Sequence, residues 1–570
     1  MTLWDRYAGR RISRRRALQS GAAAGAGAAG LWLIACGGGS RSGGDGATAT
    51  PAARGSAPGG ADIANEASPP RRGGRLRIAT PAPFDTFDPH LAVGSSVQLF
   101  PRIYNVLVNQ SPARPEFMVF DLAESLETPD STTWILHLRP GVRIGPNDVG
   151  VPERDLDGDD VVATFQRIKA EPRSPNGAFV KDFVASVRAE GSTVTITTTK
   201  PYAWFLTRVG NFVNAIPPRE LIADASAVEK MRSASAGGGP FRLASSTENE
   251  GARLERNPSY YLHEGSEALP YVDGIDVRVI PDRSAWRTAF QSQQLDAYAA
   301  DSKREADSLA ADGRFFVIKD PLFQFVPLTM NAEHPPFNDP RARRAVSRAI
   351  NRRQLIDIIY AGDAKPNGLV HWPCGVGTYA FNEDELDQLQ PHDPAEARRL
   401  SDALGGLRFK MIYPANTPVV QHSEHVPIIL QQMRDAGIGV EESPLEFTKW
   451  LGEYRARNYD ASLALTQVIE TPEFPLNWHT SNGPAGDGSF GKGIGDAEID
   501  EAIERTKTTT DFQERVKAVR DAQNVIYAKD PMFLPLVSPY SYTAYRNAVH
   551  NVPAGIGSTA LLLNTFWLEG

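Results

Sequence analysis

The sequence predicts an α/β protein with more than one lobe, and three observations lead to this fold class. The chain has 570 residues, which is too long for one compact core because single domains usually hold about 100–200 residues. Its first half carries short runs with the alternating polarity of β-strands, and its second half alternates helix-like with strand-like runs. Alternation of strand and helix is typical of a lobe built around a mainly parallel sheet.

The chain begins with the pattern of an export signal. Residues 1–35 contain arginines followed by a short run rich in Gly and Ala, which is too weakly apolar to indicate a membrane-spanning helix. The letters SRRRAL resemble the twin-arginine consensus, and LIAC, which ends at Cys36, resembles a bacterial lipobox. We therefore expect removal of residues 1–35 and lipidation of Cys36, which would hold the protein at the membrane. An uncleaved anchor helix is the alternative.

Residues 36–72 follow as a run of Gly, Ser, Ala and Pro with almost no aromatic or large aliphatic side chains. Such a segment cannot bury enough apolar surface to offset the loss of chain entropy. The sequence therefore predicts a flexible tether between the anchor and the body.

Charge and cysteine content exclude some classes of function. The formal charge is −8, and the first 35 residues hold six arginines and one aspartate, so their removal takes it to −13. A nucleic-acid binder needs a basic surface, which this balance does not offer. The second cysteine, Cys374, has no disulfide partner if Cys36 is lipidated. His371 is close enough in sequence to suggest a catalytic thiol, but we favour a buried, inert one.

The first half of the body predicts strands and a helix. Each strand-like run alternates or is rich in β-branched residues and is bounded by Gly, Pro, Asp or Ser. The runs are GGRLRIAT, TTWILHLRPGVRI, STVTITTT, PFRLAS, ARLERN and IDVRVIP. The run DGDDVVATFQRIKA predicts a helix, because Val161, Val162, Phe165 and Ile168 fall on one face at helical spacing.

The second half predicts longer helices between strands. FNDPRARRAVSRAINRRQLIDIIYAG indicates one helix that Asp339 caps and that ends before Gly362. DPAEARRLSDAL indicates another, which begins with a capping box of Asp393 and Glu396. Beyond it, strand, helix, strand, helix and strand are expected in LRFKMIYP, HVPIILQQMRDAG, IGVEESPLE, FTKWLGEYRARN and YDASLALT.

Several motifs, in a fixed order, resemble those of a known family. They include GGRLRIAT…DTFDPH (73–90), LAESLETPDSTTWILHLRPGVRI (122–144), GGGPFRL…LERNPSYY (237–261) and MNAEHPPFNDPRARRAVSRAINR (330–352). This ordered set resembles the solute-binding proteins of ABC importers, specifically extracellular solute-binding protein family 5, the peptide/nickel type. The resemblance extends from about residue 73 to about residue 553.

The resemblance implies a two-lobed fold of the type II periplasmic-binding-protein kind, with an extra subdomain in the first lobe. Lobe I is then expected at 73–322 plus 533–570, and lobe II at 323–532. It also implies a function: a monomeric receptor that needs no cofactor, performs no catalysis, captures an oligopeptide or similar solute between closing lobes and delivers it to ABC permease subunits. The alternatives are a non-peptide solute such as an oligosaccharide or metal chelate, an anchored enzyme, and a ligand sensor.

The same resemblance implies where the ligand would bind. The segment AVGSSVQ falls where relatives place a loop at the mouth of the cleft, which nominates Val93, Ser95 and Ser96. From lobe II, LTQVIETPEFPLNWHTSNG matches a segment in which peptide-binding relatives carry W-x-x-D, with the aspartate pairing with the peptide α-amine. An ungapped count back from Pro472 puts Leu465 and Val468 at these two positions.

Other residues of this lobe II segment are candidate ligand contacts. They are Gln467, Glu470 and Trp478, with Glu470 as the substitute partner for an α-amine. Trp204, in KPYAWFL, is expected to pack in the core or between subdomains instead.

A metal site is a weaker hypothesis. His422 and His425 lie three residues apart and could share a helix face, which would suit a transition metal. Two histidines near the start of a helix explain the same letters, and no further ligand can be assigned, so we predict no metal site. The motifs of P-loop ATPases, G-x-S-x-G hydrolases and H-E-x-x-H proteases are missing from the sequence.

Overall fold

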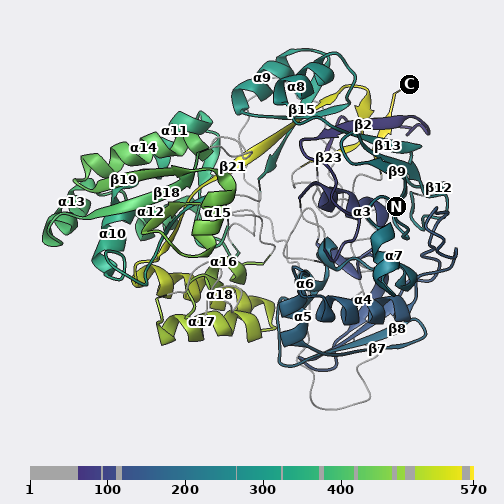
Figure 1. The fold of residues 1–570 in the computed structure, drawn as a ribbon, viewed down its shortest axis with the longest axis horizontal. Coiled ribbons are helices and arrows are strands. Elements are labelled where there is room, and N and C mark those ends of the chain that lie inside the picture. Colours follow the sequence, from purple (N-terminus) through teal and green to yellow (C-terminus); the bar gives the residue numbers. More distant parts are fainter. Residues whose placement is uncertain are drawn as a thin grey trace, which may run out of the picture.

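The computed structural model is an α/β protein of two lobes, which confirms the predicted fold class (Figure 1). The predicted export signal, Cys36 and most of the predicted tether lie outside the described residues. Among those that are described, no helix is both long and apolar enough to cross a membrane. The structure describes residues 62–91, 94–110, 118–264, 266–322, 325–371, 378–415, 422–464, 471–481, 494–554 and 565–569.

Lobe I is built around a four-stranded sheet. Its order is β2 (Arg75–Thr80), β13 (Gly274–Val279), β10 (Gly251–Arg256) and β9 (Phe241–Thr247). β2 and β13 are parallel and the other pairs are antiparallel. All four strands were predicted from the alternation of polarity. Their inward side chains pack against α3 (Phe100–Ile103) in a core that includes Phe87 and Phe241.

The extra subdomain of lobe I is a second, wholly antiparallel sheet covered by helices. The strand order is β5 (Ala123–Glu127), β6 (Thr133–Leu138), β8 (Thr193–Thr198) and β7 (Val184–Glu190). α4 (Gly158–Ala170) and α5 (Gly177–Phe183) lie beside it (Figure 1). α4 begins as predicted, because the Asp157 carboxylate accepts from the Asp160 backbone and Asp160 bonds back.

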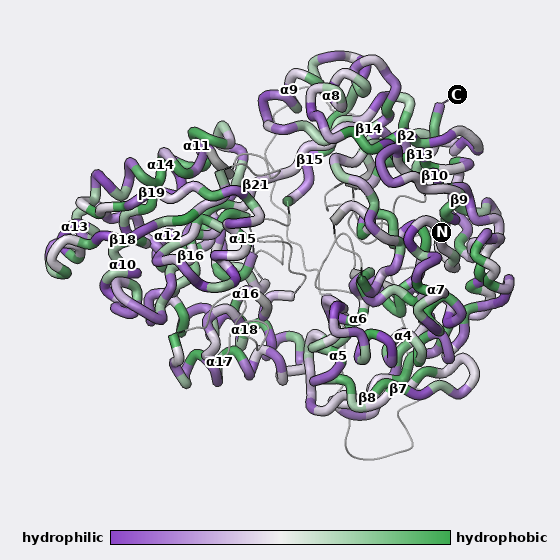
Figure 2. Tube along the Cα trace, in the orientation of Figure 1, coloured by the Kyte–Doolittle hydropathy of each residue, from purple (hydrophilic) through white to green (hydrophobic). Residues whose placement is uncertain are grey.

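Smaller elements complete lobe I. Hydrophobic and hydrophilic residues alternate along many of the elements, as expected where one face is buried (Figure 2). The elements are β3 (Val108–Gln110), β4 (Met118–Phe120), η1 (Gly94–Leu99), α6 (Phe205–Val209), η2 (Phe212–Asn214), η3 (Arg219–Leu221), α7 (Ala225–Lys230), β11 (His263–Glu264), β12 (Glu267–Ala268), α8 (Arg283–Gln291), β14 (Ala297–Ala300) and α9 (Lys303–Ala311).

Lobe II contains a mixed sheet, not the mainly parallel one that the sequence suggests. β18 (Arg408–Pro414) lies between β19 (Gly439–Leu445) and β20 (Ala461–Leu463) and is parallel to both. These three are joined by α14 (His422–Asp435) and α15 (Phe447–Arg455), as predicted. β16 (Val326–Met330), however, is antiparallel to β20. The chain enters this lobe from lobe I along β16, and no crossover helix sets the direction of that strand.

The helix predicted after Asp339 is two helices. α10 (Pro340–Ala349) ends at Ile350, whose backbone is extended, and α11 (Arg352–Tyr360) begins after Asn351, whose side chain accepts from the Gln354 amide. The apolar periodicity continues through the break because both helices pack on the same core. The predicted stop is confirmed, since Gly362 follows with a φ of 77°.

Further helices cover lobe II. α13 (Pro394–Ala403) begins at its predicted cap, Asp393, whose carboxylate accepts from the Glu396 amide. The Glu396 carboxylate instead bonds with Arg348 on α10, 3.2 Å from Nε. The remaining elements are β17 (Ala364–Pro366), α12 (Glu383–Leu389), α16 (Glu473–Asn477), α17 (Ala497–Thr508) and α18 (Phe512–Ala528).

Two strand connections join the lobes. β15 (Phe315–Pro321) lies in lobe I and leads into β16 of lobe II. The long strand β21 (Phe533–Arg546) returns: residues 533–537 pair with β16, and residues 540–546 pair with β15. One continuous strand therefore belongs to the sheets of both lobes, and it crosses the upper part of the gap between them in Figure 1.

The end of the predicted tether is part of the folded body. β1 (Asp62–Ala64) pairs with β23 (Val552–Ala554), and the Asn65 amide donates to the carbonyls of Asn547 and Val549. Residues 62–67 therefore dock on the C-terminal segment, which also contains β22 (Val549–His550) and β24 (Trp567–Leu568). Sequence composition could not reveal this, because the docking uses backbone and amide groups of small and polar residues.

Candidate functional site

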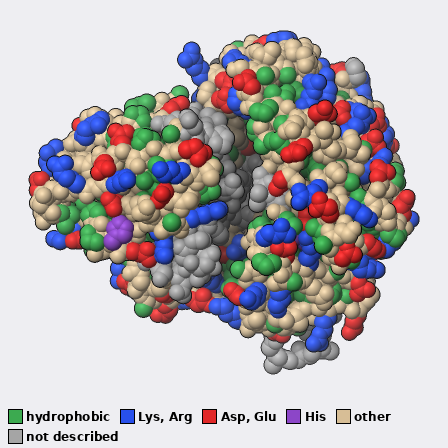
Figure 3. All heavy atoms as spheres, in the orientation of Figure 1, with side chains coloured by type: hydrophobic (Ala, Val, Ile, Leu, Met, Phe, Trp, Pro, Cys, Tyr) green, Lys and Arg blue, Asp and Glu red, His purple; other side chains and the backbone are tan. Residues whose placement is uncertain are grey.

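The candidate site is the hollow between the two lobes. The space-filling view shows a deep furrow between them, and acidic and basic side chains are interspersed on the surface around it (Figure 3). β15 and β21 cross at one end of the furrow (Figure 1). A furrow with walls from two linked bodies suits a ligand that is enclosed when the bodies approach.

Ser95 and Ser96 lie on η1 in lobe I, and both side chains are buried. Ser95 Oγ accepts from Thr80 Oγ1 at 3.0 Å. Ser96 Oγ donates to the Asp85 carboxylate at 2.6 Å and accepts from the Asp85 amide at 3.2 Å. The two hydroxyls therefore fasten η1 to neighbouring residues of lobe I. Their contact with a ligand stays a prediction.

Trp478, at the end of α16, lies within an aromatic cluster of lobe II. Its ring centroid is 4.5 Å from that of Phe533, which begins β21. The side chain is 5% exposed, and Trp450 and Tyr454 belong to the same cluster. Packing accounts for most of its surface, so a role as a cleft wall also stays a prediction. The other candidates, Val93, Gln467 and Glu470, lie outside the described residues, as does Val468.

Sequence reasoning missed Glu473, the first residue of α16. Its carboxylate is 1% exposed, and Oε1 accepts a hydrogen bond from Tyr202 Oη of lobe I at 2.7 Å. Burial and the charge of Glu473 raise the pKa of Tyr202 well above its ordinary value. The signal was an acidic residue directly after Pro472 at a helix start; its partner lies 271 positions away in the chain, beyond the reach of any local pattern.

Two histidines of the metal and thiol alternatives, His425 and His371, each have a partner within the protein. His425 is buried, with Nε2 3.3 Å from Tyr360 Oη. In the described part of the chain no three His, Cys, Asp or Glu residues are grouped to hold a metal. The buried His371 donates from Nε2 to the Leu322 carbonyl at 3.0 Å. Cys374 and the side chain of His422 lie outside the described residues.

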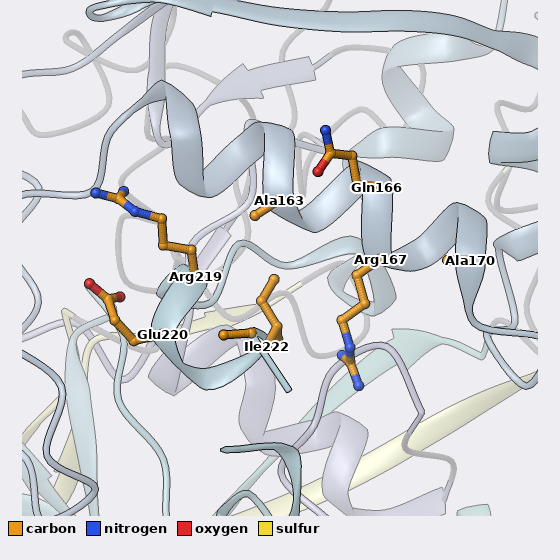
Figure 4. A pocket seen from close by; sticks show the side chains of 8 residues that line it. Ala163, Gln166, Arg167, Ala170, Arg219, Glu220 and Ile222 are labelled. Atoms are coloured by element: carbon orange, nitrogen blue, oxygen red, sulfur yellow. The ribbon is translucent and has the colours of Figure 1, made fainter. Parts of the chain in front are cut away.

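A separate hollow of about 570 Å³ lies on the extra subdomain, between α4 and η3 (Figure 4). Its charged side chains already have partners: Arg167 bonds with Asp88 at 2.7 Å, Arg219 with Asp157 at 2.8 Å, and Glu220 with Arg154 at 2.9 Å. Charged side chains that are already paired within the lobe offer little electrostatic attraction to a ligand. We therefore place the candidate site in the furrow.

Comparison with known proteins agrees with this geometry. Residues 118–487 match the model of the bacterial extracellular solute-binding proteins, family 5. The di/tripeptide-binding protein 2 of Pseudomonas aeruginosa is 23% identical over 474 residues, which cover 78% of this chain and 86% of that protein.

Two solved structures share the fold. One is the periplasmic binding protein DppA of Helicobacter pylori in complex with the peptide STSA, at a TM-score of 0.72 and 23% identity, covering 88% of this chain and 99% of that one. The other is the binding protein AgaA of A. tumefaciens R10 in complex with agropinic acid, at a TM-score of 0.71 and 18% identity, covering 87% of this chain and 99% of that one.

Proposed function

Because the chain belongs to the bacterial extracellular solute-binding proteins of family 5, we propose that it is a lipid-anchored receptor that captures an oligopeptide or a related solute for an ABC importer. The family match over residues 118–487 carries this proposal. The furrow between two lobes linked by β15 and β21 supports it. A ligand that touches both walls favours the closed arrangement, because it gains the second set of contacts only there.

The sequence places lobe I at residues 73–322 plus 533–570 and lobe II at residues 323–532, and we propose to move the second boundary from residue 533 into β21. The course of β21 supports a crossing inside the strand, at Ser538–Pro539. Residues on one side of this point pair with β16 of lobe II, and those on the other side pair with β15 of lobe I.

Binding without turnover is the first property to test. A panel of di-, tri- and tetrapeptides can be screened by thermal unfolding and by mass spectrometry of the recovered peptide. A bound peptide at 100-fold excess over its Kd should add about 2.7 kcal/mol to the free energy of unfolding and return unaltered. Recovery of a cleaved peptide, at a rate proportional to protein, would assign an enzyme instead.

The second candidate is a solute without an α-amine, and Val468 favours it. This residue occupies the position at which peptide-binding relatives are expected to carry an aspartate, and burial of an ammonium group without an anionic partner is costly. The relative bound to agropinic acid shows that this fold also accepts a ligand that is not a peptide. The proposed solutes therefore include N-blocked peptides and non-peptide compounds.

Calorimetry on one peptide in its free and N-acetylated forms separates the two candidates. If Glu470 serves as the anionic partner, only the free peptide binds tightly, and Glu470→Gln weakens its binding by about 2–5 kcal/mol. Equal binding of both forms, unchanged in Glu470→Gln, assigns the solute without an α-amine. Glu264→Gln is the control, since its carboxylate bonds with Tyr271 inside lobe I.

Anchoring is tested at Cys36. The change Cys36→Ser should abolish lipidation and release the protein from membranes into the soluble extracytoplasmic fraction, which immunoblots of cell fractions measure. The change Cys374→Ser serves as the control and should leave the distribution unaltered. A Cys36→Ser protein that stayed with the membrane at unchanged mass would assign an uncleaved anchor helix.

A further inference from the structure

A second contact joins the lobes, far from the strands that cross between them. The segment 200–205, which follows β8 and includes the first residue of α6 in the extra subdomain, touches α16 and α17 of lobe II. Its polar contacts are Tyr202 Oη to Glu473 Oε1 (2.7 Å), Ala203 N to the Lys507 carbonyl (2.6 Å), Trp204 Nε1 to the Thr506 carbonyl (3.0 Å) and Lys200 Nζ to Glu504 Oε1 (2.6 Å).

The contact is packed like a protein core. Tyr202 is 3% exposed and Trp204 is 5% exposed. The Trp204 ring meets Tyr379 edge-on at 5.4 Å, and the Arg515 guanidinium lies 5.1 Å from the indole. Its partners Thr506, Tyr379 and Arg515 all come from lobe II, so this side chain, expected in the core or between subdomains, packs between the two lobes.

Glu473 makes the contact sensitive to the loss of a single donor. Within the described residues, only Oε1 of its carboxylate has a hydrogen-bond partner, and this partner is Tyr202. A buried carboxylate that loses its donor is left with the nearby charge of Lys507, which offsets only part of the cost of desolvation. Separation of the lobes would return the carboxylate to water, so removal of the Tyr202 hydroxyl favours separation.

The position of the contact determines its effect on the furrow. β15 and β21 cross between the lobes at the top of the gap in Figure 1, whereas α17 meets the extra subdomain at the bottom. Rotation about the crossing strands that widens the furrow must therefore pull the segment 200–205 away from α17. The contact resists this rotation whether or not a solute is present.

We propose that the segment 200–205 and its partners on α16 and α17 form a latch that favours the closed arrangement without ligand. The latch residues thereby determine solute affinity without touching the solute, because apparent affinity falls with the fraction of molecules that are competent to bind. This inference rests on the proposed function for its biological meaning, but the conformational equilibrium can be measured in the ligand-free protein.

Small-angle X-ray scattering of the ligand-free protein tests the latch. The variants Tyr202→Phe and Trp204→Phe each keep an aromatic ring and remove one donor. We expect each to shift the ratio of closed to open molecules about tenfold towards the open form, which raises the radius of gyration.

Tyr261→Phe is the matched control. Tyr261 Oη also donates to a buried carboxylate, that of Asp121, at 2.7 Å, but both residues belong to lobe I. The control should keep the radius of gyration of the parent protein. An unchanged radius in both latch variants, or an equal rise in the control, would overturn the proposal.

Two further measurements keep the result independent of folding and of the solute. Circular dichroism shows whether each variant is folded at the temperature of the scattering experiment. If Tyr202→Phe or Trp204→Phe is not, Glu504→Gln weakens the latch at its exposed rim, where the two side chains are 45% and 43% exposed, and should raise the radius by a smaller amount. Failure of every peptide to bind would contradict the capture of peptides and leave the scattering result standing.

Discussion

At the scale of residues, three buried histidines connect stability to pH. Burial lowers the pKa of His90, His371 and His479 to about 4. At His90, Nε2–H donates to the Ala215 carbonyl at 3.0 Å, while Nδ1 accepts from Arg167 at 2.8 Å. Only a neutral imidazole can donate from one nitrogen and accept at the other, so this geometry and the lowered pKa agree.

We expect the protein to lose stability in mild acid. Between the folded pKa and the ordinary value of about 6.5, the unfolded chain binds protons that the folded protein refuses. The stabilisation is therefore complete above pH 6.5 and is lost as the pH falls towards 4. Each histidine should lower the free energy of unfolding by about 2 kcal/mol between pH 7 and pH 5, which urea unfolding at both values measures.

Variants assign this loss to its residues. His90→Gln should reduce the difference in the free energy of unfolding between pH 7 and pH 5 by the contribution of one histidine. His263→Gln replaces an exposed histidine on β11 and should leave the difference unchanged. A difference that stayed the same in His90→Gln would show that other groups cause the acid sensitivity.

At the scale of elements, Gly251 allows β10 to pair closely with β13. Its φ is 138°, and a Cβ at this position would lie 1.8 Å from the Val277 carbonyl oxygen. Gly191, in the turn between β7 and β8, has a φ of 61° and nothing within 4 Å of its Cβ position. The two glycines therefore separate the effect of close approach from that of backbone conformation.

Replacement by alanine should affect these two strand pairs unequally. Gly251→Ala forces β10 away from β13, and we expect it to lower the free energy of unfolding by about 3 kcal/mol or more. Gly191→Ala meets no steric clash and only places an alanine at a positive φ, so it should lower the free energy of unfolding by about 1 kcal/mol. Chemical denaturation of both variants compares them, and equal losses would contradict the steric argument.

At the scale of the whole molecule, one carboxylate of lobe II holds both crossing strands. Asp363 follows α11, accepts from Tyr542 Oη on β21 at 2.6 Å and pairs with Lys319 of β15. β17, which comes next in the chain, pairs with β21 at residues 537–539. The end of the furrow at which the strands cross is therefore fastened to lobe II by side chains as well as by the sheet.

We expect Asp363→Asn to loosen this end of the furrow. Loss of the charged acceptor weakens both contacts, so amide hydrogens of β15 and of residues 540–546 should exchange about tenfold faster. Amides of β18, in the centre of lobe II, should keep their rates. Asp387→Asn, which removes the exposed partner of Arg353, is the control. Unchanged exchange at β15 and β21 would show that the sheet alone holds the strands.

Local structure could be predicted from the sequence where the cause is local. Asp157 and Asp393 cap their helices because each carboxylate accepts from an amide three residues ahead. The strands β6 and β8 alternate between half-buried and buried residues, as their letters indicate. Asn351 is the exception: it breaks the helix predicted after Asp339, although an Asn within an apolar pattern is a signal that could have been used.

The sequence by itself determined the family, the order of the elements and the two-lobed architecture, because periodicity, caps and ordered motifs are properties of neighbouring residues. Only the tertiary structure decided which distant groups meet. It turned β16 against the parallel strands of lobe II, docked residues 62–67 on the C-terminal segment and brought Tyr202 to Glu473. Contacts of this kind depend on how separate elements pack in space, and no spacing along the chain encodes them.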